Sequence, residues 1–322
     1  MEWSSKRKSF FKNHVNLILS GGGSLGLFHL GIVKRLHELD LLPNKIHGSS
    51  VGSIIASLCC CYSNEELTIF LNKIIYVYID FFDTPWWYSM IQLLKMKNIH
   101  SGEKLIIRMK ELIGDITFQE AFNKTGRQLN ITIACIKEHK GYVLNYKNSP
   151  DVVIWSAVSC STALPGFFPD RNLYIKENGV LVSLPDSFND GAIFMDIPDV
   201  PCKLKMISIT NPLLILLNYW HQYTQNKGII LKIINFLYKL NIHKHWIVKM
   251  IICMMHSHWD FKHTYYLPMR GLIFMPFMMF NPPQFLWKRW IMYGYHSIHV
   301  KALQKIIQQI SETSLYKEEI PE

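Results

Sequence analysis

Two strand-to-helix turns rich in glycine constrain this chain more than any other feature. An apolar segment, Val15–Leu19, ends in Ser20-Gly21-Gly22-Gly23, and a second brief strand around residues 45–47 leads into Gly48-Ser49-Ser50-Val51-Gly52. Helical patterns follow both turns, over residues 25–39 and 53–61. Two strand–turn–helix units in succession predict parallel neighbouring strands that are covered on both faces. Both turns then lie at the carboxyl edge of the sheet, where such folds bind ligands.

The rest of the chain adds strands and helices around this beginning. Alternating patterns predict one hairpin from residues 129–135 and 142–146, and a second from 173–175 and 180–184, with Asn178-Gly179 as the turn. Further elements are expected as a helix over 151–161, a strand over 204–209 and helices within 213–256 and 302–310. We divide the chain into a basic N-terminal segment (1–14), a catalytic core (15–212) and a mainly helical C-terminal part (213–322) packed on the same domain.

Composition narrows the class of protein. The chain has 322 residues, and 49% of them are hydrophobic, which supplies a core and excludes general disorder. Its charge of 34 − 24 = +10 predicts attraction to an anionic partner, which could be nucleic acid, a membrane surface or an acidic substrate. Aromatic residues make up 13% of the chain and include nine Trp, and such rings favour an apolar–water boundary. Lipid is therefore the favoured partner.

The cysteines and the apolar segments indicate the compartment. Seven cysteines, an odd number, include the contiguous Cys59-Cys60-Cys61, which suits apolar packing in a reducing environment better than a disulfide framework. The basic residues near the N-terminus are not followed by the apolar region of a signal peptide. The stretch 271–287 is uncharged as far as Trp287 but is broken by prolines, so we expect no transmembrane segment and an intracellular, peripheral protein.

The second turn has the form that presents a nucleophilic serine. In Gly48-x-Ser50-x-Gly52 the flanking glycines allow a tight fold that leaves the Ser50 Oγ exposed at the start of a helix. Gly21, Gly22 and Gly23 expose backbone N–H groups at another helix N-terminus, where developing negative charge is favoured. We interpret them as an oxyanion hole. Ser49 is the rival nucleophile, but the glycine spacing centres on Ser50.

The first turn also resembles two kinds of nucleotide-binding loop. Gly21, Gly23 and Gly26 satisfy the G-x-G-x-x-G pattern of a dinucleotide loop, which requires an acidic residue at the end of the next strand. That strand ends in His47-Gly48, and Asp40 lies outside a strand, so this interpretation is disfavoured. A phosphate-binding P-loop is weaker still because no Gly-Lys-Ser/Thr follows.

A serine nucleophile needs a base, and Asp190 is the candidate. In Asn189-Asp190-Gly191-Ala192 two small residues follow the aspartate, so its carboxylate can be held on a tight turn beside the end of another strand. The alternative is an ordinary turn aspartate.

These motifs, in this order and context, resemble the signatures of the patatin-like phospholipases. The resemblance is closer to the intracellular triacylglycerol lipases of fungi and plants, because it also includes residues 117–122, 125–127, 144–146 and 149–150, and the stretch from Val153 to Phe168. It covers residues 15–212, with a fainter tail to about residue 310. The motif glycines are Gly26, Gly48, Gly52 and Gly191.

The resemblance implies a three-layer α/β/α patatin-like fold with a mainly parallel central sheet, and a Ser50–Asp190 dyad without a catalytic histidine. It also implies a lipid acyl hydrolase, most simply a triacylglycerol lipase at a membrane or lipid-droplet surface, with no metal or organic cofactor. A phospholipase A or lysophospholipase, and an inactive membrane-binding or nucleic-acid-binding protein, stay open as alternatives; the scattered basic residues disfavour nucleic acid.

The sequence also departs from these lipases. They carry a long N-terminal extension, so we expect a trimmed catalytic core here. Some relatives are acyltransferases with a His-x4-Asp motif, which none of the fourteen histidines forms.

Two further groups of residues permit either a structural or a functional interpretation. Aromatic stretches around Phe81-Phe82 and Trp86-Trp87-Tyr88, and around Trp287-Lys288-Arg289-Trp290 with Tyr293, fit either core or a lipid-facing cap. Cys253 with His256, His258 and His263 lacks the spacing of a zinc site.

Overall fold

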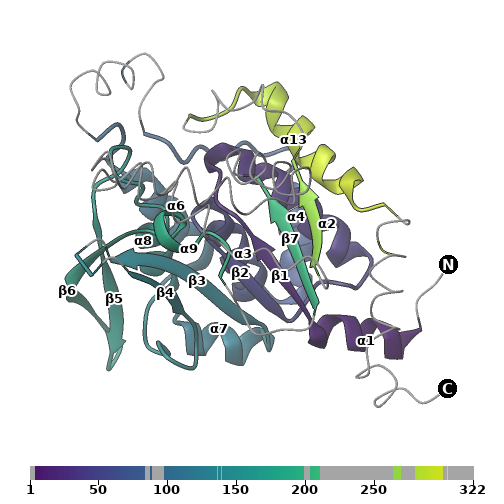
Figure 1. Ribbon diagram of the computed structural model, residues 1–322, viewed down its shortest axis with the longest axis horizontal. Coiled ribbons are helices and arrows are strands. Elements are labelled where there is room, and N and C mark those ends of the chain that lie inside the picture. The colour runs from purple at the N-terminus through teal and green to yellow at the C-terminus, as the bar shows by residue number, and fades with distance from the viewer. Residues whose placement is uncertain are drawn as a thin grey trace, which may run out of the picture.

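The computed structural model describes residues 4–83, 88, 98–135, 137–138, 140–198, 204–210, 264–269, 280–299 and 303. The architecture is the expected α/β fold, with a central sheet between layers of helices (Figure 1). All five residues of β1 (Val15–Leu19) are buried. Since successive strand residues point to opposite faces, both faces of the sheet are covered at its centre.

The sheet is mixed, and its parallel part contains the two glycine turns. The strand order is β5-β6-β3-β2-β1-β7-β8, with β4 also paired to β3. β2 (Lys45–Gly48), β1, β7 (Leu204–Ile209) and β8 (Thr264–Pro268) are parallel, as is the pairing of β2 with β3 (Gln128–Cys135). The predicted strand over 204–209 is confirmed, and β8 shows that the C-terminal part of the chain contributes a strand to this sheet.

Both predicted hairpins are present, and they make the far side of the sheet antiparallel. β4 (Lys140–Leu144) pairs with β3, while β5 (Arg171–Glu177) pairs with β6 (Val180–Asp190). At the tip of the second hairpin Asn178 has φ 50° and Gly179 has φ 80°, the left-handed conformations that favour Asn-Gly in a two-residue turn. The end of β6 then pairs with β3, where Asp190 lies opposite Ile133.

Helices follow each of the two turns as predicted, with adjusted boundaries. After β1, a short 3₁₀ turn (Gly23–Gly26) precedes α2 (Leu27–Glu38), and after β2, α3 runs from Val51 to Cys61. The helix expected over 151–161 begins only at Ile154, because Val152 forms an isolated bridge with Ile175 of β5 and Val153 forms one with Thr117. The basic N-terminal segment is itself helical, as α1 (Ser5–His14).

The remaining helices have clear local causes. Capping boxes start α4 (Asn64–Lys73) at Ser63 and α7 (Phe118–Thr125) at Thr117. Left-handed Gly102 precedes α6 (Glu103–Ile113). The one-turn α9 (Ala192–Met195) follows β6 directly, and α8 (Ile154–Ser161) is wholly buried.

α13 (Gln284–Ser297) is brought from the C-terminal part onto α2 by an unusually close crossing (Figure 1). A Cβ on Gly31 would lie 1.9 Å from the Ile291 carbonyl oxygen, and one on Gly294 would lie 1.9 Å from that of Phe28. Both positions therefore exclude any side chain. This contact fixes α13 beside the turns at the carboxyl edge of the sheet.

The structure divides the aromatic residues of the C-terminal stretch between core and surface. Trp287 and Trp290 are buried, Tyr293 is half-buried, and Lys288 and Arg289 are exposed. Phe81 and Phe82 are half-buried and Tyr88 is 39% exposed, while Trp86 and Trp87 lie outside the described residues. The helices expected within 213–256 lie outside the described residues, and of 302–310 only Leu303, in helical conformation, is described.

Candidate active site

The predicted nucleophile stands on a strained turn between β2 and α3. Ser50 has φ 50° and ψ −125°, a conformation that L-residues rarely adopt and that costs on the order of 1–3 kcal/mol. The Ser50 N–H donates to the Ser161 Oγ at 3.0 Å, and the carbonyl of Ser50 accepts from the Ser53 hydroxyl at 2.6 Å. Ser161 is buried at the end of α8 and was not singled out from the sequence. The strain is thus held by contacts on both sides of Ser50.

Close backbone packing explains both glycines that flank Ser50. A Cβ on Gly48 would lie 2.4 Å from the Gly52 carbonyl oxygen, and one on Gly52 would lie 2.1 Å from that of Leu19. Gly26 connects this turn to the first one, since a Cβ there would lie 2.2 Å from a Val51 methyl. The two turns therefore pack directly against each other.

The predicted base lies at the end of β6, which is separated from β2 by β3 alone. Asp190 ends β6, is 2% exposed and lies close enough to Ser50 for the serine side chain to lower the pKa of its carboxyl group. The Ala192 N–H also donates to Asp190 Oδ1 at 2.9 Å. Gly191 permits this turn because a Cβ there would lie 2.4 Å from the Thr132 carbonyl oxygen. The sequence-predicted pair of Ser50 and Asp190 is thus brought together without a histidine between them.

Burial makes Asp190 a stronger base than an ordinary carboxylate. Desolvation raises its pKa to about 7, and the hydrogen bonds from Ser50 and Ala192 oppose this rise. The nearby carboxylate of Asp196 raises the pKa further. A carboxyl group with this pKa can accept and return a proton near neutral pH.

Asp196 is a residue of the site that the sequence reasoning missed. It is 5% exposed and accepts a hydrogen bond from the Gly21 N–H at 2.7 Å. The Gly21 N–H is therefore already engaged by a carboxylate. Of the three glycines predicted to form the oxyanion hole, Gly22 and Gly23 stay as the candidate donors. The sequence signal that could have identified Asp196 is its position six residues after Asp190, on the other side of the one-turn helix α9.

A buried polar network holds the backbone of the first turn. His29 on α2 contacts the Ser208 Oγ through Nδ1 at 2.6 Å and the Ser20 carbonyl oxygen through Nε2 at 2.9 Å. The Thr210 hydroxyl donates to the Gly21 carbonyl at 2.9 Å and lies 3.2 Å from His29 Nε2. Burial lowers the pKa of His29 to about 4, so its ring is neutral at physiological pH. This histidine acts on the glycine loop and is away from the Ser50–Asp190 pair.

An apolar pocket opens over these groups. Its volume is about 200 Å³, and its floor contains Gly21, Gly22, Gly23, Ser50 and Asp190. Its walls are nearly all apolar and are drawn from α2, α3, α4, α6, residues 79–82, residues 164–168 and α13, including Leu27, Ile54, Phe70, Leu105, Phe168 and Trp287. Such a pocket suits a long apolar substrate group that ends in a polar bond at the floor.

Neither a metal nor a membrane-spanning helix is indicated in the part of the chain that the structure describes. No group of three or more His, Cys, Asp or Glu side chains there is arranged to hold a metal ion, and Cys253, His256, His258 and His263 lie outside it. Among the helices described, none is both long and apolar enough to cross a bilayer.

Three curated proteins named as triacylglycerol lipases are similar to this chain. The chain is 39% identical over 198 residues to triacylglycerol lipase 4 of Saccharomyces cerevisiae, covering 56% of this chain and 22% of that protein. It is 38% identical over 205 residues to triacylglycerol lipase SDP1L of Arabidopsis thaliana, covering 58% of this chain and 26% of that protein. It is 34% identical over 200 residues to triacylglycerol lipase ptl3 of Schizosaccharomyces pombe, covering 56% of this chain and 40% of that protein. The chain thus spans well under half of the length of each of these relatives.

A solved structure and a family model also match. VipD from Legionella pneumophila is similar with a TM-score of 0.44 at 11% identity, covering 92% of this chain and 67% of that one. The family model described as patatin-like phospholipase matches residues 17–198, which contain both turns, Ser50, Asp190 and Asp196. The chain therefore belongs to the patatin-like phospholipase family.

Proposed function

We propose that this chain is a serine-dependent lipid acyl hydrolase that cleaves fatty acyl esters of glycerolipids, with triacylglycerol as the favoured substrate. The observation that carries the proposal is the juxtaposition of Ser50 and buried Asp190 in the lining of one apolar pocket. The named triacylglycerol lipases among its relatives support the choice of substrate.

In the first half of the proposed reaction, the Ser50 Oγ attacks the ester carbonyl carbon while its proton passes to Asp190. The negative charge that develops on the carbonyl oxygen is stabilised by the N–H groups of Gly22 and Gly23 at the head of α2. Asp190 then returns the proton to the leaving glycerolipid alcohol, and an acyl-Ser50 ester is left.

In the second half, water takes the place of the alcohol. Asp190 accepts a proton from the water as it attacks the acyl-Ser50 carbonyl, and the second tetrahedral intermediate collapses to the fatty acid. The proton returns to the Ser50 Oγ, which restores the starting state. The apolar walls hold the acyl chain in place throughout.

We further propose that the protein acts as a peripheral intracellular protein on a membrane or lipid-droplet surface, without a cofactor. The net charge of +10 and the apolar pocket support the choice of a lipid surface.

A fluorophosphonate probe tests the nucleophile. We expect the wild-type protein to be labelled and Ser50→Ala to lose labelling. Ser49→Ala is the matched control, because Ser49 is adjacent but buried at 1% exposure, and it should be labelled as the wild type is. Equal labelling of Ser50→Ala and wild type would remove Ser50 from the reaction.

Two substrates test the specificity. Purified protein should release fatty acid from emulsified triolein faster than from phosphatidylcholine vesicles. Hydrolysis of phosphatidylcholine alone would instead establish a phospholipase A with the same pair of residues.

A further inference from the structure

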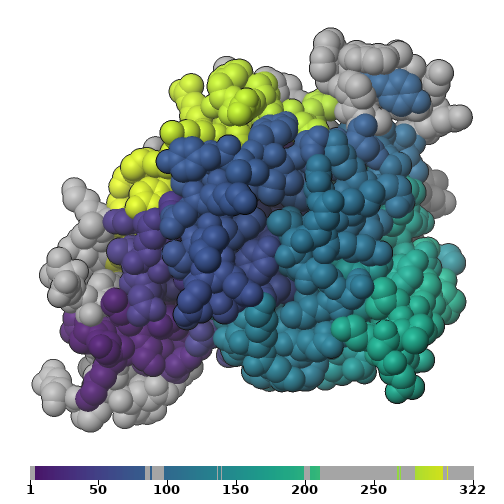
Figure 2. All heavy atoms as spheres, turned by 180° about the vertical axis from the view of Figure 1, so that it is seen from behind, coloured from purple at the N-terminus to yellow at the C-terminus, as the bar shows by residue number. Residues whose placement is uncertain are grey.

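Large apolar side chains stand in solvent at the edge of the active-site pocket. They come from the residues that follow α4 and from the start of α13, and their exposed fractions are 74% for Tyr76, 40% for Val77, 36% for Tyr78 and 72% for Phe285. Single exposed apolar residues are common, but a group from two distant segments indicates a surface with a partner. Figure 2 shows these two segments adjoining, as the blue surface beside the yellow one.

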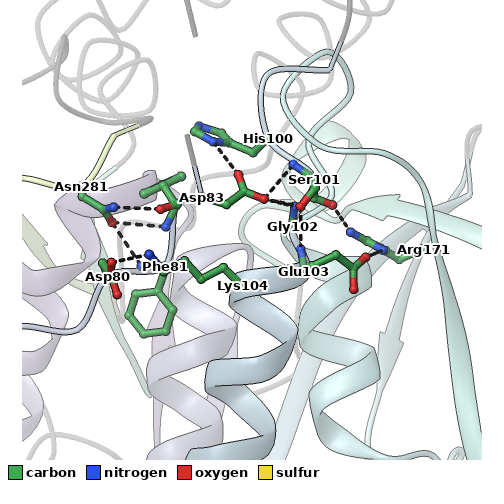
Figure 3. A network of polar contacts seen from close by, with 11 residues as sticks. Asp80, Phe81, Asp83, His100, Ser101, Gly102, Glu103, Lys104, Arg171 and Asn281 are labelled. Carbon is green, nitrogen blue, oxygen red and sulfur yellow. Dashed lines mark hydrogen bonds and ion pairs between the residues drawn. The ribbon is translucent and has the colours of Figure 1, made fainter. Parts of the chain in front are cut away.

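The two segments are fastened together, so this surface has a fixed shape. The Asn281 Oδ1 accepts from the N–H groups of Phe81 at 3.1 Å and Phe82 at 3.2 Å, and its Nδ2 donates to the Phe82 carbonyl at 2.9 Å. The Asn281 side chain therefore both accepts from and donates to the backbone of the neighbouring segment, as Figure 3 shows.

Aromatic contacts extend this fastening toward α4. The Tyr78 hydroxyl donates to the Pro282 carbonyl at 2.9 Å, and the Tyr78 ring lies 5.0 Å from that of Trp287. The Trp287 Nε1 donates to the Ile74 carbonyl at 2.8 Å. Trp287 is thus fixed at both the ring and the indole nitrogen.

The other end of the segment after α4 is held by α6 (Figure 3). Asp83 accepts from the N–H groups of Ser101 at 3.0 Å and Gly102 at 3.2 Å, and its Oδ1 lies 3.2 Å from His100 Nδ1. Asp80 pairs with Lys104 and, at 3.4 Å, with Arg108. Asp80 is therefore paired with two cations of α6, and Asp83 is hydrogen-bonded by residues just before α6.

The same two segments also form the pocket wall. Ile74, Ile79, Phe81, Phe82, Pro282 and Trp287 line the pocket. The exposed side chains and the pocket wall are consequently two faces of one layer. A partner that binds the exposed face of this layer would lie next to the opening of the pocket. Molecules of that partner could then enter the pocket directly.

Cations lie among the exposed rings. Lys73, Lys288 and Arg289 are exposed, and the Lys288 Nζ lies 5.4 Å from the centre of the Tyr76 ring. Aromatic rings combined with lysine and arginine fit the boundary between acyl chains and anionic headgroups. The charge of the surface is complementary to such headgroups.

We propose that this surface, made by Tyr76, Val77, Tyr78 and Phe285 with Lys73, Lys288 and Arg289, docks the protein on a lipid surface that carries anionic headgroups. This inference rests on the proposed function, because a lipid substrate is the reason for the pocket to face a lipid surface. Docked in this way, the apolar rings insert at the interface, and the pocket opens onto the lipid.

Vesicle binding and catalysis are measured on the same variant. Tyr76→Ser combined with Val77→Ser and Phe285→Ser should lower the fraction that sediments with phosphatidylcholine vesicles containing about one-third phosphatidylserine by about tenfold or more. These three residues do not line the pocket, so hydrolysis of a soluble ester such as p-nitrophenyl butyrate should stay within about twofold of wild type. Triolein hydrolysis should fall with binding.

The matched control uses apolar side chains that are exposed elsewhere. Val180 and Val182 on β6 are 63% and 39% exposed, and their replacement by Ser should leave vesicle binding unchanged. Lys288→Gln with Arg289→Gln should weaken binding to the anionic vesicles by about fivefold per charge and leave binding to pure phosphatidylcholine unchanged.

The outcomes separate the two proposals. Unchanged vesicle binding by the triple serine variant overturns the docking surface. So does a wild-type dimer that the same variant converts to a monomer in light scattering, since the surface would then bind a second copy. A wild-type protein that binds vesicles but hydrolyses no ester instead contradicts the proposed function alone.

Discussion

The two glycine turns look alike in sequence but are built by different physical means. At the second turn, Gly48 and Gly52 are required because neighbouring backbone atoms lie where their side chains would be. At the first turn, Gly22 and Gly23 have φ 151° and 56°. The loop is held by the Thr210 hydroxyl, which donates to the Gly21 carbonyl, and by Asp196, which accepts from the Gly21 N–H. The second turn presents a side chain from closely packed backbone, whereas the first presents backbone N–H groups from a loop that buried polar side chains hold.

Each turn also faces its own buried carboxylate. Asp190 lies beside the Ser50 side chain at the second turn, and Asp196 accepts from the Gly21 N–H at the first. The two carboxylates lie on either side of α9, so one helical turn serves both glycine turns. Substitutions can therefore be aimed at one turn or the other.

The largest effect is expected at the second turn. Gly52→Ala places a Cβ 2.1 Å from the Leu19 carbonyl oxygen, and backbone at this site cannot move aside. We expect a loss of at least about 3 kcal/mol in the free energy of unfolding, with loss of fluorophosphonate labelling.

Gly179→Ala is its control, because a Cβ there meets nothing within 4 Å and only the positive φ of 80° opposes it. Urea denaturation should show a cost of about 1 kcal/mol for this variant. Equal costs at the two glycines would contradict close packing as the cause at Gly52.

Asp190→Asn should separate activity from stability. Hydrolysis should fall by about 10³-fold because the base is lost. The pKa of Asp190 is raised from its ordinary 3.8 to about 7, so the folded state binds more protons than the unfolded state between these pH values, and stability is lost as pH rises through that window. At pH 8 the variant should be more stable than wild type by on the order of 1–3 kcal/mol, and below pH 4 the difference should vanish.

Thermal denaturation at both pH values measures this change. Asp186→Asn, an exposed carboxylate on the same strand, should change neither activity nor stability. A destabilised Asp190→Asn at pH 8 would contradict the desolvation of this carboxylate.

Asp196→Asn tests the carboxylate at the first turn. The amide oxygen can still accept from the Gly21 N–H, but the charge that raises the pKa of Asp190 is gone. The acidic limb of the pH–rate profile should therefore move to lower pH, with a fall in kcat of less than about tenfold. An unchanged acidic limb would show that the Asp196 charge does not reach Asp190.

Thr210→Val should have the smallest effect. It removes the hydroxyl that donates to the Gly21 carbonyl at 2.9 Å, while the shape of the side chain is kept. A cost of about 1–2 kcal/mol in the free energy of unfolding is expected, and Thr210→Ser should restore most of it. A cost as large as that of Gly52→Ala would abolish the distinction between the two turns.

The sequence predicts the parts of the fold and site that depend on local patterns. The strand–glycine–helix units, the Asn178-Gly179 hairpin and the strand over 204–209 each carry their signal within a few residues, and all are present. The pairing of Ser50 with Asp190 was reached through motif order, since their residue types alone left Asp190 open as an ordinary turn residue.

What the sequence could not predict depends on contacts between distant segments. The engagement of Gly21 by Asp196, the support of Ser50 by Ser161 and the fastening of residues 81–82 by Asn281 each join positions more than 100 residues apart. The burial of Trp287 and the exposure of Phe285, two residues away, likewise follow from the docking of α13 on α2.

The strand that carries Asp190 also sets when the site can form. Ser50 belongs to a local strand–turn–helix unit, whereas Asp190 follows it by 190 − 50 = 140 residues and reaches it only through the antiparallel pairing of β6 with β3. During synthesis from the N-terminus, the serine therefore leaves the ribosome long before its partner, and the incomplete chain lacks its proposed base. A ribosome-bound chain that ends before β6 should be inert toward membrane lipids, so the topology delays the proposed hydrolysis at least until β6 has been made.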